Sequence, residues 1–482
     1  MQFNSYAFIL CFLPITLLLY FVANRIKPVL GKFVIIIASI VFCLLGQSNM
    51  LIYLGISMLI NYAFVLVNKR FKFTNKIILA LPIIVNVGLL LYFKYLNFAI
   101  TNINMIFGKE IPFMEIILPL GISFYTFQQI AYIVATERGD LENNNIIDYI
   151  AYILYFPKLV MGPIMDPVDY ISQINQETRK QVDITNIAIG IKLFSLGLIK
   201  KVILADTFAK AVTWTYTNIY AATAMDCILL TMFYTFEIYF DFSGYSDMAV
   251  GISSMFNIDL PMNFDSPYKA ISIRDFWKRW HISLTNFLTK YIYIPLGGAR
   301  RGIILTYVNT LIVFLVSGLW HGANWTFILW GILHGLFSCF DRMFDKVEEK
   351  LFIPVRWFCT FAIVNMLWLL FSAQSVAQWK MILFKILFMQ NTSISDGIIS
   401  AFNLVENQFI YNMLGLNYLP NNVRGFNMLI FIMIASVVCF VPENNYRKRE
   451  SLSIWSLLLA TFAFIWGVLC LGAESTFVYY GF

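Results

Sequence analysis

The chain has 482 residues, of which 60% are hydrophobic and only 13% charged, with a mean hydropathy of +0.73 and a formal net charge of +7. These values exclude an ordinary soluble enzyme, because repeated apolar runs of about 18 residues or more are long enough to span a bilayer. They also exclude a nucleic-acid-binding protein, which would need a basic soluble face. The sequence therefore predicts an all-α polytopic membrane protein whose excess positive charge belongs to cytoplasmic loops.

The N-terminal part of the chain predicts four membrane spans. They cover Ala7–Ala23, Phe33–Leu45, Met50–Val67 and Ile77–Phe98. Basic clusters follow the first and third spans, and both belong on the cytoplasmic side. The second and third spans form a hairpin, which returns the chain to that side. No basic lead or small-residue cleavage site precedes the first span, so we expect it to remain as a helix and not to be removed as a signal peptide.

Three interrupted apolar stretches and a loop follow. The stretches are Glu115–Ala135, Ile150–Met165 and Ile184–Leu204, and the loop is Thr136–Asp148. The first contains Gln128 and is expected to line something polar instead of lipid. The second is broken by Pro157, which predicts a re-entrant or interfacial element. The third contains Lys200 and Lys201, so it is either an amphipathic surface helix or a tilted span with snorkelling lysines.

A span over Cys227–Ile252 carries an unusual set of polar side chains. They are Glu237, Asp241, Ser243, Tyr245, Ser246 and Asp247. Carboxylates at membrane depth face a cavity, a partner charge or water. Two interpretations stay open: these carboxylates form buried ion pairs with Arg274, Lys278 or Arg279, or they take part directly in chemistry.

All three histidines of the chain, His281, His321 and His334, lie between Phe276 and Leu336. Histidine is the side chain best suited to proton transfer near neutral pH. His321 follows the uncharged run Ile303–Trp320, and the glycines around it predict a helix break. A histidine at membrane depth by default marks a functional site. The alternative is a packing histidine that is hydrogen-bonded to a backbone carbonyl.

The C-terminal half predicts alternating crossings. The basic segment 256–301 contains no clean span and belongs on the cytoplasmic side. The spans are Ile303–Trp320, Trp325–Phe340, Phe352–Phe371, Met428–Val441 and Ser453–Gly472, with the polar segment Ser372–Asn427 on the outer side. His321 then lies roughly 30 Å from Arg300 and Arg301, in the outer half of the bilayer or at the floor of an outward cavity. His281 lies on the cytoplasmic side, and the two histidines meet only if Phe276–Leu288 dips into the membrane or a pocket runs inward.

The polar residues predict a type of chemistry. A histidine beside a buried hydroxyl favours acyl transfer, in which the imidazole takes the hydroxyl proton as the oxygen attacks a thioester or ester carbonyl. Trp320, Asn324 and Trp325 are candidates for shaping such a pocket. Trp277 and Trp280, which flank Lys278 and Arg279, are either interfacial anchors, the favoured interpretation, or ligand contacts. No Gly-x-Ser-x-Gly elbow and no His-x-x-x-His pair occurs, which disfavours a serine hydrolase and a metal site.

Several motifs resemble those of the membrane-bound O-acyltransferases. They are Arg279-Trp280-His281-Ile282-Ser283, Tyr293-Ile294-Pro295-Leu296-Gly297-Gly298 and Leu319-Trp320-His321-Gly322, extended by the segments Leu118–Gln128 and Tyr239–Asp247. The likeness is greatest to the bacterial branch that contains the membrane subunit of alginate O-acetylation and its peptidoglycan and cellulose counterparts. It runs from near the N-terminus to the C-terminus.

The resemblance implies a ring of about 10–12 transmembrane helices, with re-entrant or interfacial helices, around a central tunnel with an inner funnel for the acyl donor and an outer one for the acceptor. It implies that His321 is the catalytic histidine and His281 the second active-site residue, and it assigns no role to His334. Substrate contacts are expected from Trp320, Asn324, Trp280, Arg279, Tyr239, Asp241, Ser243 and Gln128. Residues 1–482 then form a single domain, with a catalytic core over about 115–340.

We therefore expect a membrane O-acetyltransferase in the cytoplasmic (inner) membrane of a bacterium. By resemblance the donor is acetyl-CoA, and no metal is expected. The expected partners are this cytoplasmic donor, an extracytoplasmic acetyl-transfer protein or a cell-surface polysaccharide acceptor, and membrane lipid, but no nucleic acid. Two alternatives stay open: D-alanyl transfer from a carrier protein to a cell-wall polymer, and a non-catalytic transporter of a polar solute that uses Asp241 and Asp247.

Overall fold

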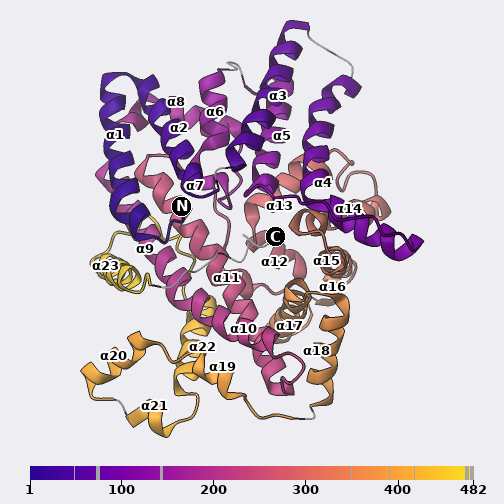
Figure 1. Ribbon diagram of the computed structural model, residues 1–482, viewed down its shortest axis with the longest axis vertical. Helices are drawn as coiled ribbons and strands as arrows, with labels where there is room; N and C mark the ends of the chain where they lie inside the picture. The colour runs from indigo at the N-terminus through magenta and orange to yellow at the C-terminus, as the bar shows by residue number, and fades with distance from the viewer. Residues whose placement is uncertain are drawn as a thin grey trace. The chain divides into compact units, whose positions relative to one another are not determined.

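The computed structural model of the protein describes residues 1–47, 49–71, 76–141, 145–348, 350–389, 391–416, 418–472 and 477. Throughout these residues, every regular element is a helix (Figure 1). The predicted all-α class is therefore confirmed. The chain divides into two compact units: unit 1 comprises Met1–Phe194, Ser246–Pro261 and Leu452–Leu457, and unit 2 comprises Ser195–Tyr245, Met262–Ser451 and Leu458–Phe482.

Unit 1 contains the N-terminal helices. They are η1 (Ala7–Phe12), α1 (Leu13–Ile26), α2 (Pro28–Leu44), α3 (Asn49–Phe71), α4 (Lys76–Phe107), α5 (Ile122–Arg138), α6 (Ile146–Leu154), α7 (Phe156–Leu159), α8 (Pro167–Asn175), η2 (Glu177–Lys180) and the first part of α9 (Ile184–Ile199). Helix α1 stops at Lys27, whose backbone is extended, and Pro28 starts α2 at the position where proline is best tolerated. The four predicted N-terminal spans are thus all helical.

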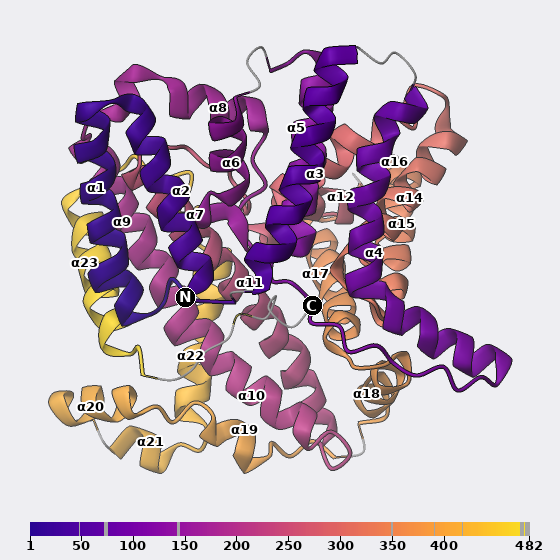
Figure 2. The same ribbon diagram turned by 45° about the horizontal axis from the view of Figure 1, so that its top comes forward.

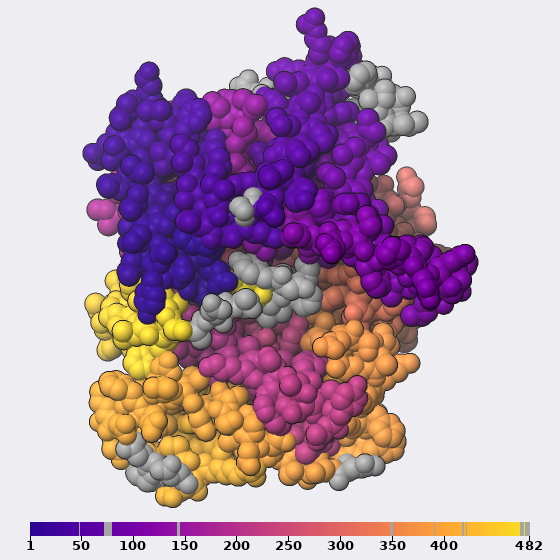
Figure 3. Space-filling model, in the orientation of Figure 1, coloured from indigo at the N-terminus to yellow at the C-terminus, as the bar shows by residue number. Residues whose placement is uncertain are grey.

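Helices α1 and α2 lie side by side (Figure 2). Their close approach depends on Gly31, because a Cβ there would lie 2.2 Å from the Asn24 side-chain oxygen. The outer surface of α1 is apolar, because Leu18 and Ile26 are 66% and 68% exposed. Ile15, Leu19 and Val22 of the same helix are also exposed, and such a continuous apolar surface suits lipid better than water. The N-terminal helices, coloured indigo, lie on the surface in the space-filling view (Figure 3).

Five helical segments are long and apolar enough to cross a membrane. They are Ala7–Ile26, Asn49–Phe71, Ala80–Phe107, Ile303–His321 and Ile353–Ser372, and the shorter apolar helices Pro28–Leu44, Phe426–Phe440 and Ile454–Leu469 coincide with three more predicted spans. The chain is therefore a multi-pass membrane protein. The expected total of ten to twelve spans stays a prediction.

The part of the first interrupted stretch that forms α5 is largely buried and contacts polar groups, as predicted. Gln128 on α5 accepts a hydrogen bond from Lys158 of α7, and Gln129 accepts one from Ser57 at 2.9 Å. The stretch around Pro157 is two short buried helices, α6 and α7, separated by Tyr155. The expected loop after α5 is shorter than predicted, because α5 continues to Arg138 and α6 begins at Ile146; residues 142–144 lie outside the described residues.

Unit 2 contains the remaining helices. They are η3 (Lys200–Ala205), α10 (Asp206–Thr217), α11 (Ala224–Met255), which continues into unit 1, η4 (Pro267–Lys269), α12 (Ile273–Arg279), α13 (Ile282–Leu288), η5 (Thr289–Tyr293), α14 (Ile303–His321), α15 (Trp325–Met343), α16 (Asp345–Glu348), α17 (Ile353–Ser372), α18 (Val376–Phe388), α19 (Asp396–Ser400), α20 (Val405–Leu414), α21 (Tyr418–Asn422), α22 (Phe426–Phe440) and α23 (Ile454–Leu469), which begins in unit 1 and continues in unit 2 from Leu458. As predicted, segment 256–301 contains only short helices.

Helices α14 and α15 form a tight antiparallel hairpin, in which glycines allow the two backbones to approach. A Cβ at Gly318 would lie 2.4 Å from the carbonyl oxygen of Phe327, and one at Gly331 would lie 2.4 Å from that of Phe314. This packing fixes the helix that ends at His321 against the helix that carries His334.

Candidate active site

The site is built around the end of α14. The predicted helix break is confirmed: α14 ends at His321, Gly322 is extended, and α15 begins at Trp325. Asn324 caps the new helix, because its side-chain oxygen accepts a hydrogen bond from the backbone N–H of Thr326 at 3.1 Å. Because α14 ends at His321, this side chain is not enclosed by a further turn of its own helix and can contact neighbouring elements.

His321 is 3% exposed and is surrounded by aromatic rings. The ring centroids of Trp320, Trp330 and Phe371 lie 4.9, 5.1 and 5.2 Å from that of His321, each in an edge-to-face arrangement. Such rings hold an imidazole in one orientation. They also exclude bulk water from it, which strengthens any hydrogen bond that it makes.

His281 lies in the turn between α12 and α13, outside the spanning helices, and is fully buried. Its backbone is left-handed, with φ 45°, an uncommon conformation for a residue other than glycine that is found at functional sites. The turn is held by backbone hydrogen bonds to a preceding extended segment: Ile282 N–H donates to Asn263 O, and Asp265 N–H donates to Arg279 O, each at 2.9 Å. Burial lowers the pKa of His281 to about 3, so its imidazole is neutral at physiological pH.

The two predicted catalytic histidines meet at one tryptophan. The Trp320 ring centroid lies 6.0 Å from that of His281 and 4.9 Å from that of His321. They reach it because α12 packs against α15 and carries His281 inward. The two histidines therefore do approach one another, and whether Phe276–Leu288 dips into the membrane, as their meeting was expected to require, stays a prediction.

His334 has a different environment. It is fully buried on α15, and Trp277 Nε1 donates a hydrogen bond to its Nδ1 at 3.1 Å. Its ring also packs against Trp330 at 4.7 Å. Through the hydrogen bond, His334 fixes the position of Trp277. The motif resemblance likewise assigns His334 no catalytic role. Trp277 and Trp280 are 7% and 1% exposed, so the interpretation of both as interfacial anchors is wrong.

The buried carboxylate of Asp241 forms an ion pair with a buried lysine. Lys201 Nζ lies 2.7 Å from Asp241 Oδ1 and 2.8 Å from Asp206 Oδ1, and all three residues belong to unit 2. The π-helix η3 turns Lys201 inward, where it is 1% exposed, so snorkelling of this lysine is wrong. Pairing of Asp241 with Arg274, Lys278 or Arg279 is also wrong. Lys201 and Asp241 therefore neutralise one another inside the protein, and removal of either partner would leave an uncompensated buried charge.

The other predicted substrate residues have varied surroundings. Trp280 packs at 4.7 Å from Trp368, and Tyr239 lies within 6.3 Å of Trp280. Arg279 pairs with Asp275 at 2.8 Å, and the Ser243 hydroxyl is buried without a hydrogen-bond partner among the described residues. Asn324 also donates to Gln374 O at 2.9 Å, and its neighbour Trp325 is 54% exposed. Gln128 belongs to unit 1, so its predicted role beside the histidines stays a prediction.

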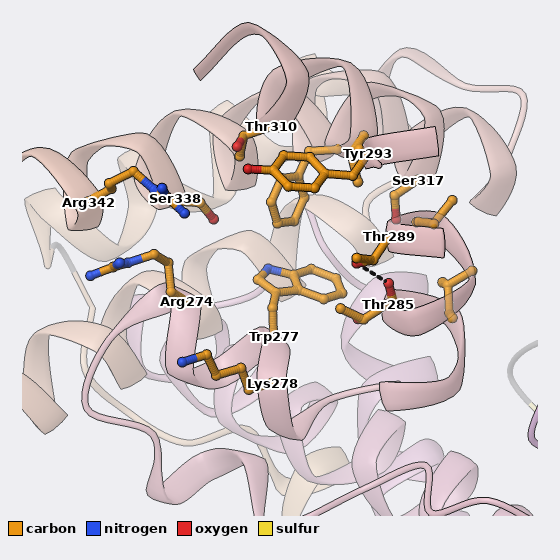
Figure 4. Close-up of a pocket in the computed structure, with 14 residues that line it drawn as sticks. Arg274, Trp277, Lys278, Thr285, Thr289, Tyr293, Thr310, Ser317, Ser338 and Arg342 are labelled. Atoms are coloured by element: carbon orange, nitrogen blue, oxygen red, sulfur yellow. Dashed lines mark hydrogen bonds between the residues drawn. The ribbon is translucent and has the colours of Figure 1, made fainter. Parts of the chain in front are cut away.

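A cavity of about 260 Å³ lies between α12, α13, η5, α14 and α15 of unit 2 (Figure 4). Arg274, Lys278 and Arg342 gather at one end of it, and the hydroxyls of Thr285, Thr289 and Ser317 lie at the other. The lining residues are Arg274, Trp277, Lys278, Leu284, Thr285, Leu288, Thr289, Tyr293, Thr310, Val313, Phe314, Ser317, Ser338 and Arg342. A cationic end and apolar walls suit an elongated ligand that has an anionic head and an uncharged arm.

Two features connect this cavity to ligand binding and to His321. The hydroxyls of Ser317 and Ser338 are buried without a partner among the described residues, and both line the cavity. Ser317 lies one helical turn before His321. On the opposite wall, the Trp277 ring lies 5.7 Å from Trp330, which in turn contacts His321. Trp277 and Trp330 therefore form a chain of ring contacts from the wall of the cavity to His321.

Sequence reasoning missed the residues that position the histidines. Asn263 and Ser283 hydrogen-bond around His281, and Trp330, Trp368 and Phe371 pack around the site. The aromatic residues lay in apolar spans, where a ring gives no separate signal. No group of three or more His, Cys, Asp or Glu side chains that could hold a metal ion occurs in the described part of the chain.

Comparisons with known proteins agree with this geometry. Residues 124–384 match the MBOAT, membrane-bound O-acyltransferase family. The peptidoglycan O-acetyltransferase of Helicobacter pylori is 33% identical over 100% of this chain and 97% of its own length. The probable alginate O-acetylase AlgI of Pseudomonas aeruginosa is 37% identical over 79% of this chain and 74% of its own length.

A more distant relative is the teichoic acid D-alanyltransferase of Streptococcus thermophilus, which is 28% identical over 45% of this chain and 55% of its own length. The family match covers more than half of the chain and includes His281, His321 and the cavity. The chain therefore belongs to the membrane-bound O-acyltransferase family and is a multi-pass acyltransferase.

Proposed function

We propose that the protein transfers an acetyl group from acetyl-CoA on the cytoplasmic side of a bacterial inner membrane to O-acetylate a polysaccharide of the cell envelope. The observation that carries the proposal is the meeting of His281 and His321 at Trp320. The relatives support the choice of group, because the match to an O-acetyltransferase spans the whole chain, whereas the match to a D-alanyltransferase spans 45% of it. Acceptance of the acetyl group by an extracytoplasmic partner protein, which then modifies the polysaccharide, is the second route.

His321 acts as the general base. As the acceptor hydroxyl oxygen attacks the thioester carbonyl carbon, His321 takes the hydroxyl proton. The carbon–sulfur bond then breaks, and the imidazolium returns the proton to the leaving thiolate. The products are an acetyl ester and a free thiol, so atoms and charge balance. His281 lies on the other side of Trp320 and completes the catalytic pair.

The cavity is the proposed site of the donor. Lys278 and Arg342 suit the phosphates of coenzyme A, whereas Arg274 also pairs with Asp345 at 2.5 Å. The apolar walls and the Ser317 and Ser338 hydroxyls, which have no partner among the described residues, suit the pantetheine arm. A thioester bound there lies beside Trp277, whose ring packs on Trp330 and through it on His321. We assign the catalytic core to residues of about 115–340, which include both histidines and all but one of the cavity residues.

The test is the activity of His321→Ala in cells. We expect surface polysaccharide acetylation to disappear while the amount of protein in the membrane stays the same, because general-base catalysis supplies about 10²–10⁴ of the rate. Asn309→Leu on the same helix is the control, since Asn309 is buried but contacts no histidine. Full acetylation by His321→Ala would refute the proposal.

The donor site has a separate test. Arg342→Met is expected to raise the KM for acetyl-CoA by about tenfold, because one charge-assisted phosphate contact contributes about 1.5–3 kcal/mol. Lys346→Met is the matched control: Lys346 is an exposed cation of the adjacent α16 that does not line the cavity. An unchanged KM in Arg342→Met would place the donor elsewhere. Acyl transfer from a purified carrier protein, but not from acetyl-CoA, would instead favour D-alanyl transfer.

A further inference from the structure

One ring nitrogen of His281 makes a hydrogen bond, and the other has no hydrogen-bond partner among the described residues. Its Nδ1 lies 3.1 Å from Asn263 Oδ1. Its Nε2 is buried and has no hydrogen-bond partner among the described residues. Which nitrogen carries the proton decides whether the free one donates or accepts, and therefore what His281 can do to a substrate.

The partners of Asn263 settle which of its side-chain atoms is the oxygen. The atom that faces His281 also accepts from the backbone N–H of Ser283 at 3.3 Å and from the Ser283 hydroxyl at 2.8 Å. A backbone N–H can only donate, so this atom must accept and is the amide oxygen. Since an amide oxygen cannot donate, the hydrogen bond to His281 requires a proton on Nδ1.

We infer that Asn263, supported by Ser283, is a positioning residue that holds His281 as its Nδ1–H tautomer, with the lone pair on Nε2 available to the reaction. This inference rests on the proposed function. It assigns His281 a specific part: its Nε2 accepts a hydrogen bond or a proton from the acyl acceptor. It cannot donate a hydrogen bond to the developing oxyanion of the acyl group.

The backbone makes this arrangement rigid. Asn263 is 2% exposed, and its backbone carbonyl accepts a hydrogen bond from Ile282 N–H at 2.9 Å. Both its main chain and its side chain are therefore hydrogen-bonded to the turn that contains His281. Phe242 packs edge-on against the His281 ring at 4.7 Å. The ring therefore cannot flip to exchange its nitrogens without breaking these contacts.

Nitrogen-15 NMR of the protein labelled at histidine, in lipid bilayers, tests the inference without a substrate. The chain has three histidines, and loss of signals in His281→Gln assigns the pair of interest. We expect a protonated Nδ1 and an unprotonated Nε2 in the wild type and in Asn263→Asp, which keeps the accepting oxygen. In Asn263→Leu this preference should be lost, whereas Asn309→Leu should preserve it. A protonated Nε2 in the wild type overturns the inference, even if Asn263→Leu does not fold.

The activity arm separates positioning from folding. Asn263→Leu should lower kcat by at least about tenfold with little change in KM for the donor, because loss of a group that orients a catalytic imidazole costs that much or more. Asn263→Asp should restore most of kcat. Normal kcat in Asn263→Leu would overturn the positioning role. If instead His281→Gln were fully active while the NMR result held, the catalytic role of His281 would fail but the tautomer assignment would stand.

Discussion

His281 and His334 are both fully buried in the same unit, yet their hydrogen bonds give them opposite tautomers. The Nδ1 of His281 faces an amide oxygen and must donate, which leaves a lone pair on Nε2. The Nδ1 of His334 faces the indole N–H of Trp277 and must accept, so the proton of its neutral ring is on Nε2. The difference shows that burial alone does not make a histidine catalytic; the partner of one nitrogen decides what the other can do.

The largest expected effect distinguishes these two histidines by activity. His281→Gln should lower acetyl transfer by about 10²–10⁴, because the amide cannot exchange protons. His334→Gln should lower it by less than about tenfold, since a glutamine oxygen can still accept from Trp277. Acetate released by mild base from purified envelope polysaccharide measures both. Equal losses in the two variants would break the distinction.

A smaller effect is expected from the partner of His334. Trp277→Phe keeps a ring but removes the hydrogen bond to His334, which should reduce stability by about 1–3 kcal/mol. Thermal unfolding in detergent measures this loss. In the histidine-labelled NMR experiment only the His334 signals should shift. A shift confined to His281 would contradict the separate roles.

The sequence predicted the elements around His321 well because their signals are local. A long uncharged run followed by glycines and Asn324 predicts a helix and a break, and both occur; the cap that Asn324 forms on α15 is visible only in the structure. The motif resemblance also predicts that His281 and His321 are catalytic and assigns no role to His334, and this assignment stays a prediction. These predictions needed only neighbouring residues.

The partners of buried polar groups could not be predicted in the same way. One of the two interpretations paired Asp241 with a basic residue further along the chain, but its partner is Lys201, 40 residues earlier. Asn263 lies 18 residues before His281, in a segment without regular structure. Such pairs depend on how the π-helix η3 and the turn at His281 are oriented, and neither a π-helix nor a left-handed histidine has a sequence signal in this chain.

The smallest expected effect concerns the segment that carries Asn263. The guanidinium of Arg447 donates two hydrogen bonds of 2.7 Å to Asp265, and this contact lowers the pKa of the Asp265 carboxyl. The ionised pair therefore stabilises the fold above the ordinary aspartate pKa of about 3.9, and this stabilisation is lost as the pH falls through the lower folded value.

Arg447→Gln should accordingly lower the unfolding temperature slightly at pH 7, and the difference from the wild type should vanish under strongly acidic conditions. Lys448→Gln is the matched control, because Lys448 makes an exposed ion pair with Glu443 at 3.6 Å. Because Asp265 N–H also binds Arg279 O beside the His281 turn, the variant should broaden the NMR signals of His281 but not those of His334. Broadening of the signals of both histidines would mean that the segment around Asp265 positions His334 as well as His281, which would contradict their separate hydrogen bonds.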